Sequence, residues 1–162
     1  MPFSPTSPFQ LWEISSQRTR ALLKGHKKRV TFLGFVPHGR LLVSASWDHS
    51  IRIWNVRDGS CKNISNGNLS RSLCSVSLSL DGRFVTAVNG RKELSIWDIR
   101  TGQVIGTFGD SAHVAFMPDG KGLVGCRDNT VRYWNVGPRS EQGTEQVEVI
   151  EFEGHTVCWF QC

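Results

Sequence analysis

The chain has 162 residues, of which 39% are hydrophobic and 20% are charged. This composition suits one soluble domain with a packed core and excludes a disordered chain. No apolar run approaches the roughly 18 residues of a membrane helix, and residues 1–8 lack the pattern of a secretory signal. The five cysteines form no Cys-x-x-Cys pair, so we expect reduced thiols in an intracellular protein, without a metal site.

The net charge of +5 is unevenly spread along the chain. Residues 1–100 hold 15 Lys and Arg against 6 Asp and Glu, a balance of +9, whereas residues 101–162 hold 4 against 8, a balance of −4. A basic half attracts nucleic acid or an acidic protein. The alternative is a solvated surface with scattered charge, and we favour it because only residues 24–29 are dense in basic side chains.

Four tryptophans recur with a nearly constant period. Trp12, Trp54, Trp97 and Trp134 are separated by 42, 43 and 37 residues. Each ends a run in which apolar and polar residues alternate, and such runs predict half-buried β-strands. The chain is therefore expected to repeat one β-structured unit.

Two further markers recur in phase with the tryptophans. Residues 37–40, 80–83 and 118–121 are turn sequences whose glycine supplies a positive φ. Gly-His pairs occur at 25–26 and again at 154–155, which is 129 residues or three periods of 43. With these markers the chain resembles the WD-repeat family, whose repeats are four-stranded blades of a β-propeller.

The resemblance implies an all-β fold, a β-propeller of WD repeats that forms an incomplete arc. We expect a partial blade at 9–23, full four-stranded blades at 24–63, 66–108 and 109–153, and the start of another blade at 154–157. Residues 1–8 are predicted to be disordered, 137–146 to form a mobile loop, and 158–162 to be a divergent tail. Because closed propellers contain about 4–8 blades, we interpret the chain as a truncated product, a fragment or a partial gene model. Its open strand edges would pair with another copy or with missing blades.

In the WD-repeat family a buried hydrogen-bonded tetrad locks each blade, and the resemblance assigns it to His26, Ser44, Asp48 and Trp54. Buried polar groups of this kind need partners, because each unpaired one costs a few kcal/mol. The second full blade offers only Thr86 near the serine position, and the third keeps Asp128 but has Val124 there. We therefore predict that residues 24–63 form the stiffest blade. The other residues that define blades are Trp12, Trp97, Asp128, Trp134 and His155.

The same His, Ser and Asp have the residue types of a catalytic set, but the structural lock accounts for them without a substrate. The chain has neither a Gly-x-Ser-x-Gly elbow nor a phosphate-binding Gly-x4-Gly-Lys-[Ser/Thr] loop. We therefore predict a protein that is not an enzyme and has no cofactor.

Partner-binding positions of the family lie at the start of the first strand of a blade and just before the turn aspartate. Carried over by position, they are Arg29, Thr31 and Trp47 in the first full blade and Arg127 in the third, with Ser72, Gly90 and Asp110 as further candidates. Trp and Arg dominate interface hot spots. Either Trp47 anchors a partner or it packs on its own blade.

The closest resemblance within the family is to fungal Groucho-like general transcriptional corepressors, seen in residues 127–135 and 149–155. That likeness implies a non-catalytic scaffold for protein–protein interactions, within a transcriptional repression complex. Direct nucleic-acid binding by the basic half and a truncated product without independent function are the alternatives. No membrane partner is expected, and the predicted location is intracellular, in the nucleus rather than the cytoplasm.

Overall fold

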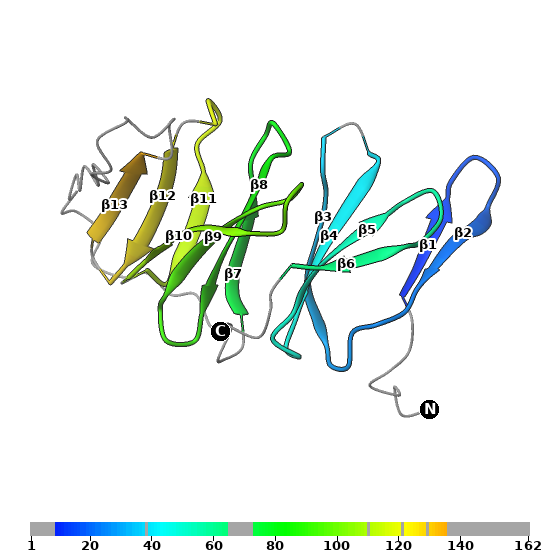
Figure 1. Ribbon diagram of the computed structural model, residues 1–162, viewed down its shortest axis with the longest axis horizontal. Coiled ribbons are helices and arrows are strands. Elements are labelled where there is room, and N and C mark those ends of the chain that lie inside the picture. Colours follow the sequence, from blue (N-terminus) through cyan, green and yellow to red (C-terminus); the bar gives the residue numbers. More distant parts are fainter. Residues whose placement is uncertain are drawn as a thin grey trace.

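The computed structural model describes residues 9–37, 39–64, 73–109, 111–120, 122–128 and 130–135. Every regular element in these residues is a β-strand, and the strands form four separate antiparallel sheets. The sheets follow one another in chain order and fan out side by side (Figure 1). The all-β fold of propeller blades expected from the sequence is thus confirmed.

We call the first sheet the N-terminal hairpin and the next three sheets blades one to three. In each sheet, strands that are consecutive in the sequence are hydrogen-bonded neighbours. The hairpin comprises β1 (Phe9–Glu13) and β2 (Arg18–Leu23). Blade one comprises β3 (Val30–Phe35), β4 (Leu41–Ser46), β5 (Ile51–Asn55) and β6 (Cys61–Asn63). Blade two comprises β7 (Leu73–Leu78), β8 (Phe84–Asn89), β9 (Leu94–Asp98) and β10 (Val104–Phe108). Blade three comprises β11 (His113–Phe116), β12 (Gly122–Arg127) and β13 (Thr130–Asn135).

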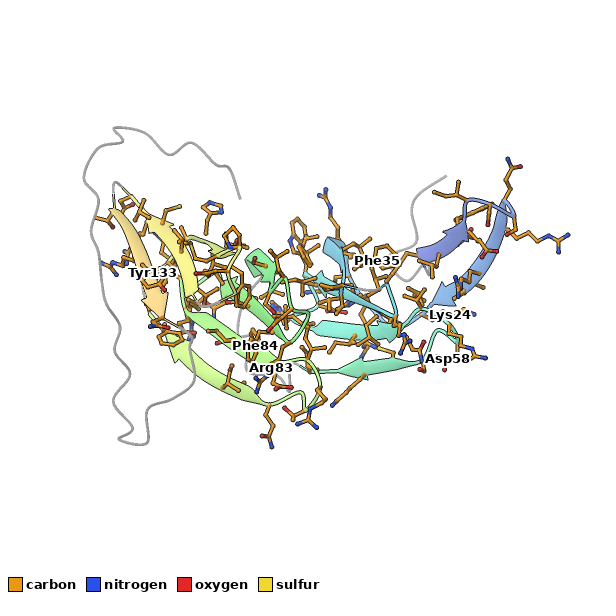
Figure 2. All side chains as sticks on the ribbon, turned by 90° about the horizontal axis from the view of Figure 1, so that it is seen from above. Lys24, Phe35, Asp58, Arg83, Phe84 and Tyr133 are labelled. Atoms are coloured by element: carbon orange, nitrogen blue, oxygen red, sulfur yellow. The ribbon has the colours of Figure 1, made fainter. Side chains whose placement is uncertain are left out.

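Several expectations fall outside the described residues: the disordered segment at 1–8, the loop at 137–146, the remainder of the blade expected up to residue 153, the start of another blade at 154–157 with His155, and the tail at 158–162. Within the described part the sheets stand in an open arc (Figure 2). The limits of the individual blades as domains stay predictions.

The phased turns bring neighbouring blades into close contact. Gly82, in the β7–β8 turn, has a φ of +70°, and a Cβ atom there would lie 2.5 Å from Cγ1 of Val36 in blade one. Glycine is therefore required at this turn by both its backbone conformation and its packing.

The core lies between the sheets. Blades one and two enclose the largest cluster, in which Val43, Ala45, Ile51 and Ile53 face Val85, Ala87 and Trp97. Blades two and three enclose a second, built from Val88, Leu94, Ile96, Val114, Leu123 and Trp134. A third, around Leu23, Leu42, Trp54 and Val56, joins blade one to the hairpin. Each sheet is therefore stabilised chiefly by its neighbours in the sequence.

The repeating tryptophan of each blade is buried against the sheet that precedes it. Trp54, Trp97 and Trp134 are 0%, 2% and 3% exposed, and Trp54 meets Phe9 of the hairpin edge to face with ring centroids 5.4 Å apart. Trp12, on the outward side of the hairpin, is 58% exposed. The repeating tryptophan is therefore buried where a described sheet precedes its own sheet, and exposed in the hairpin, which no described sheet precedes.

None of the described residues lies in a helix, so none contributes to a helix long and apolar enough to cross a membrane.

Replacing Trp97 by alanine should lower the free energy of unfolding by about 3–5 kcal/mol, because the indole fills the interface between blades one and two. Leu80→Ala is the control: its side chain is exposed, so its effect should stay within about 0.5 kcal/mol. Urea unfolding of the 162-residue chain, followed by circular dichroism, measures both. Equal losses for the two variants would contradict the packing of Trp97.

Candidate functional site

Four elements of blade one and its approach segment bring the predicted tetrad together. His26 lies between β2 and β3, Ser44 in β4, Asp48 in the β4–β5 turn and Trp54 in β5. His26 Nε2 lies 2.7 Å from Ser44 Oγ, and His26 Nδ1 lies 3.0 Å from Asp48 Oδ2. The indole N–H of Trp54 donates to Ser44 Oγ at 2.8 Å. The side chains are thus linked in one chain of hydrogen bonds.

The donors and acceptors fix the tautomer of His26. Trp54 can only donate and Asp48, when ionised, can only accept. Ser44 therefore accepts from Trp54 and donates to Nε2, while the proton on Nδ1 is donated to Asp48. Every member is satisfied only when the imidazole is neutral and protonated on Nδ1.

Two serines that the sequence reasoning missed hold the aspartate in place. Ser50 Oγ donates to Asp48 Oδ1 at 2.5 Å and lies 3.1 Å from His26 Nδ1. Ser46 Oγ accepts the backbone N–H of Asp48 at 3.1 Å and donates to the carbonyl of Lys28 at 3.0 Å. A hydroxyl two residues after a turn aspartate is a local sequence signal for such a contact.

Burial and hydrogen bonds together set the protonation of both ionisable members, whose side chains are only 4% (His26) and 8% (Asp48) exposed. Desolvation lowers the pKa of His26, and the hydrogen bond to Asp48 opposes this only in part. Burial acts to raise the pKa of Asp48, but hydrogen bonds from Ser50, from the backbone N–H of Lys27 and from His26 outweigh it and lower that pKa to about 2. The carboxylate is therefore charged and the imidazole neutral near pH 7.

The network contains the residue types of a hydrolytic triad, but a substrate cannot reach its serine. Ser44 and Trp54 are fully buried, and the ring of Phe9 from the hairpin stacks 6.4 Å from that of His26. The hydroxyl oxygen of Ser44 already accepts a hydrogen bond from Trp54. This geometry fits a structural lock between the strands of blade one.

The register of blades two and three corrects two sequence assignments. In blade one Leu42 pairs with Trp54, which places Ser44 two residues further along the strand. By the same register the serine position is Ala87 in blade two, where Val85 pairs with Trp97. Thr86 points to the other face of β8, and its hydroxyl donates to the carbonyl of Ser95 at 3.0 Å.

In blade three the serine position is Gly125, not Val124, because Leu123 pairs with Trp134. A Cβ atom at Gly125 would collide with Ser111 Oγ and with the indole ring of Trp134. The space of the serine is therefore filled by the neighbouring side chains.

Asp128 also differs from its expected place. Arg127 pairs with Thr130, so the β12–β13 turn is one residue shorter than the β4–β5 turn. The shorter turn leaves the Asp128 side chain 80% exposed, 3.4 Å from Arg127 Nε. The assignment of Asp128 as a buried blade-defining aspartate was therefore wrong.

Blade two organises its equivalent turn around a buried amide. Asn89 Oδ1 accepts the backbone N–H groups of Arg91 and Glu93 at 2.8 and 3.1 Å, and its Nδ2 donates to Glu93 Oε2 at 2.7 Å. The full polar network therefore occurs in blade one alone among the described residues.

Arg29 and Trp47 meet at the surface, where Trp47 immediately precedes Asp48 of the network. Cζ of Arg29 lies 5.5 Å from the centroid of the Trp47 ring, and the backbone N–H of Trp47 donates to the carbonyl of Arg29 at 2.9 Å. Trp47 is 44% exposed. With the exposed side chains of Lys27 and Lys28, these residues form what we call the rim of blade one.

Of the other candidates for partner binding, Thr31 is exposed two residues from Arg29, and the rest lie in blades two and three or outside the described residues. The hydroxyl of Thr31, at a β-bulge in β3, turns back toward the carbonyl of Ala45 at 3.5 Å. Arg127 contacts Asp128 in blade three, and Gly90 is exposed in the corresponding turn of blade two. Ser72 and Asp110 lie outside the described residues.

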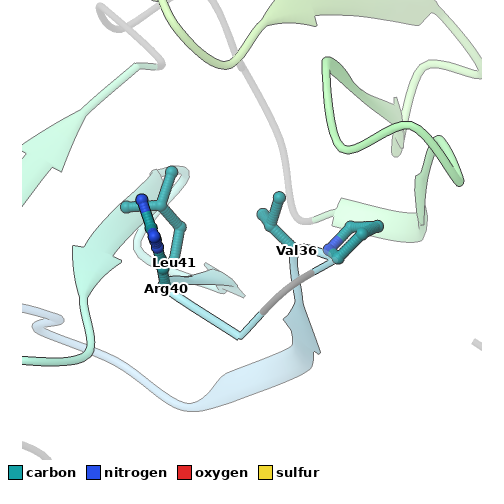
Figure 3. Close-up of a pocket in the computed structure, with 4 residues that line it drawn as sticks. Val36, Arg40 and Leu41 are labelled. Carbon is teal, nitrogen blue, oxygen red and sulfur yellow. The ribbon is translucent and has the colours of Figure 1, made fainter.

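At the opposite end of β3 and β4, a pocket is lined by Val36, Pro37, Arg40 and Leu41 (Figure 3). Its lining is mostly apolar, and Arg40 is exposed to solvent. Within the described residues no group of three or more His, Cys, Asp or Glu is placed to hold a metal ion.

Replacing Asp48 by asparagine should lower the free energy of unfolding by about 1–3 kcal/mol, because a buried acceptor of several hydrogen bonds becomes in part a donor. Asp128→Asn is the matched control, and it should cost less than about 0.5 kcal/mol because that side chain is exposed. Urea unfolding measures both, and a larger loss for Asp128→Asn would overturn the assignment.

The lowered pKa of His26 predicts a loss of stability in mild acid. Below the ordinary value of 6.5 the unfolded chain takes up a proton that the folded chain refuses, so the free energy of unfolding should fall as the pH drops below about 6.5. His26→Gln should flatten this dependence. A further loss should follow between about pH 4 and pH 2, because the unfolded chain protonates Asp48 near its ordinary pKa of 3.8 while the folded chain, in which that pKa is lowered to about 2, keeps the carboxylate ionised. Unfolding curves from pH 8 to pH 2 provide the measurement, and an unchanged slope in His26→Gln would exclude His26 as the source.

Comparison with known proteins finds a known repeat in two segments of the chain. The sequence model of the family described as "WD domain, G-beta repeat" matches residues 16–55 and 102–135. Pre-mRNA-processing factor 19 of Bos taurus is 30% identical over 153 residues, which cover 90% of this chain and 29% of that protein. Autophagy-related protein 16 of Arabidopsis thaliana is 34% identical over 97 residues, 59% of this chain and 18% of that protein.

Ribosome assembly protein 4 of Saccharomyces cerevisiae is 46% identical over 50 residues, 30% of this chain and 10% of that protein. The chain thus spans less than a third of the length of each of these relatives. Their names refer to pre-mRNA processing, autophagy and ribosome assembly, so they lend no support to the closer resemblance to Groucho-like corepressors. Two segments of the chain thus match the WD repeat, and the four-stranded antiparallel sheets have the form of the blades of that family.

Proposed function

We propose that this chain is a non-catalytic scaffold that binds other proteins through the rim of blade one. The single observation that carries the proposal is the exposed pair of Arg29 and Trp47 on a turn that the buried network holds rigid. Tryptophan and arginine are the residues that most often dominate binding energy at interfaces.

The turn is organised before any partner arrives. The backbone of Trp47 is tied to Arg29, and the next residue, Asp48, is fixed by Ser46 and Ser50. A side chain presented on a rigid turn loses little conformational entropy when it is covered, so more of its contact energy appears as affinity. Trp47 supplies the apolar contact, and Arg29 supplies charge and hydrogen-bond donors beside it.

The charge of the rim selects the class of partner. Lys27, Lys28 and Arg29 are exposed, and so are Arg91 and Lys92 in the equivalent turn of blade two. A basic surface speeds the association of an acidic partner more than it raises final affinity. We therefore infer that the partner is an extended acidic segment of another protein, with an apolar side chain for Trp47.

Two finer predictions remain within this proposal. A role in transcriptional repression stays an alternative setting for the same scaffold, and a nuclear location stays a prediction that imaging of a fluorescent fusion would test. The burial of Ser44 supports the absence of catalysis, because a nucleophile must be reached by its substrate.

The proposal predicts that the chain enriches acidic peptides with an apolar anchor from a displayed random peptide library. Trp47→Ala should weaken binding of the enriched peptides by about thirtyfold or more, as expected for a hot spot. Arg29→Glu should weaken it further through charge reversal. Val104→Ala, which removes an exposed side chain on β10 of blade two, should leave binding unchanged, and fluorescence anisotropy gives the affinities.

Two outcomes would contradict the proposal. Peptides that bind both rim variants as tightly as the unchanged chain would place the binding surface elsewhere. Binding of duplex DNA with a log–log salt slope of several phosphate contacts, lost in Arg29→Glu, would instead favour the nucleic-acid alternative.

A further inference from the structure

A run of basic side chains leads directly into an exposed hydroxyl residue on blade one. Lys27, Lys28 and Arg29 precede Val30 and Thr31, and Thr31 lies exposed in β3. In the whole sequence, Thr31 is the only serine or threonine with a lysine or arginine both two and three positions before it. The sequence therefore distinguishes this hydroxyl from every other one in the chain.

The charge beside Thr31 has the pattern that selects a class of protein kinase. A kinase reads the charged residues next to the acceptor hydroxyl and so discriminates between substrates. Lys28 and Arg29 are both exposed in the loop before β3, and they offer two adjacent cations to an acidic substrate groove. The segment therefore has the chemistry of a substrate for a kinase that recognises basic residues.

The backbone at Thr31 departs from the ladder of β3. Val30 pairs with Ser46 and Phe32 with Ala45, so a bulge leaves Thr31 opposite no residue of β4. β3 is also an edge strand of its sheet. The Thr31 hydroxyl lies 3.5 Å from the carbonyl oxygen of Ala45, at the outer limit of a hydrogen bond. Rotation of this hydroxyl into solvent therefore costs little.

A phosphate at this position would spare the buried network of blade one. The hydrogen bonds of the network join His26, Ser44, Asp48 and Trp54, and none of these bonds involves Thr31. The modified chain should therefore keep its fold and the position of the β4–β5 turn.

We propose that Thr31 is phosphorylated by a kinase that recognises basic residues, and that the phosphate switches off the binding of an acidic partner at the rim. The hydroxyl oxygen of Thr31 bonds to the γ-phosphorus of ATP, the bond from this phosphorus to the β–γ bridging oxygen breaks, ADP leaves, and the hydroxyl proton passes to the catalytic base of the kinase. The switch rests on the function proposed above, because it needs an acidic partner.

Charge is the physical basis of the switch. Lys27, Lys28 and Arg29 carry three positive charges, and a phosphate adds about −1.5 to −2 charges beside them. The guanidinium of Arg29 stacks on Trp47, and phosphate oxygens accept strong hydrogen bonds from such a donor. An acidic segment would then find its cation engaged and would meet a like charge.

Treatment of the folded 162-residue chain with ATP and the catalytic subunit of cAMP-dependent protein kinase, which prefers paired basic residues before the acceptor, tests the site. Mass spectrometry should find the phosphate on Thr31, and Lys28→Gln should lower its initial rate at least about tenfold. Ser60 is the internal control, because it is exposed and follows Arg57 by three positions but has Asp58 two positions before it. It should stay unmodified.

The acidic peptides enriched from the displayed library measure the switch. The phosphorylated chain should bind them at least about tenfold more weakly than the untreated chain. Thr31→Val, taken through the same kinase treatment, should show equal affinity before and after it. Phosphorus NMR needs no partner: beside Lys28 and Arg29 the phosphate should titrate with a pKa below its ordinary value of about 6.

Several results would overturn the proposal. The site is wrong if Thr31 stays unmodified, if Ser60 reacts as fast, or if the rate rises in the less stable Trp97→Ala, which would show that the kinase uses unfolded chain. The switch is wrong if the peptides bind the treated and untreated chains equally, or if the phosphate titrates at its ordinary pKa. If the library yields no peptide, the function proposed above fails and the switch with it, whereas mass spectrometry and NMR still decide the site.

Discussion

Packing of one tryptophan per repeat against the preceding sheet is the interaction on which the architecture depends. It joins each blade to its predecessor, because Trp97 and Trp134 sit in the cores shared with blades one and two. The interaction has a direction along the chain. The tryptophan of a blade packs against the preceding sheet, whereas the opposite side of the blade, which carries Ala45 in blade one and Val88 in blade two, packs against the following sheet. A stack built this way has two unlike ends, and burial of apolar surface favours the covering of both.

The buried network of blade one adds a second kind of order to this stack. Apolar packing fixes which sheets are neighbours, but it leaves the position of a loop loosely determined. Hydrogen bonds are directional, and a buried polar group without a partner is costly. The network from Trp54 to Asp48 therefore transmits the rigidity of the core to the β4–β5 turn. Buried hydrogen bonds of the neighbouring Asp48 therefore fix the position of Trp47 at the surface.

Periodicity in the sequence was enough to predict the strands of blade one, because four phased tryptophans set the frame, whereas the tetrad contacts were predicted from the resemblance to the WD-repeat family. It could not resolve the register of β8 and β12, where Thr86 and Val124 were each placed one residue from the true serine position. A shift of one residue keeps the alternation but reverses the face. The shorter turn at Asp128 depends on backbone geometry, which composition does not encode, whereas the supporting role of Ser50 had a local signal in its spacing from Asp48. The exposure of Trp12 depends on which sheets lie beside it, so no local pattern reveals it.

The position of the complete network within the arc has a physical rationale. Blade two is flanked on both sides by described sheets of at least three strands, and its Asn89 turn dispenses with the network. Blade one packs on the hairpin through Leu42, Trp54 and Val56. The hydrogen bonds of His26 and Ser44 join the same tryptophan to the β4–β5 turn, so in blade one this interface is linked to a loop at the surface. The rim lies on the loops of blade one, whereas the core clusters lie between the sheets, so a partner that covers Trp47 leaves the packing of the blades unchanged.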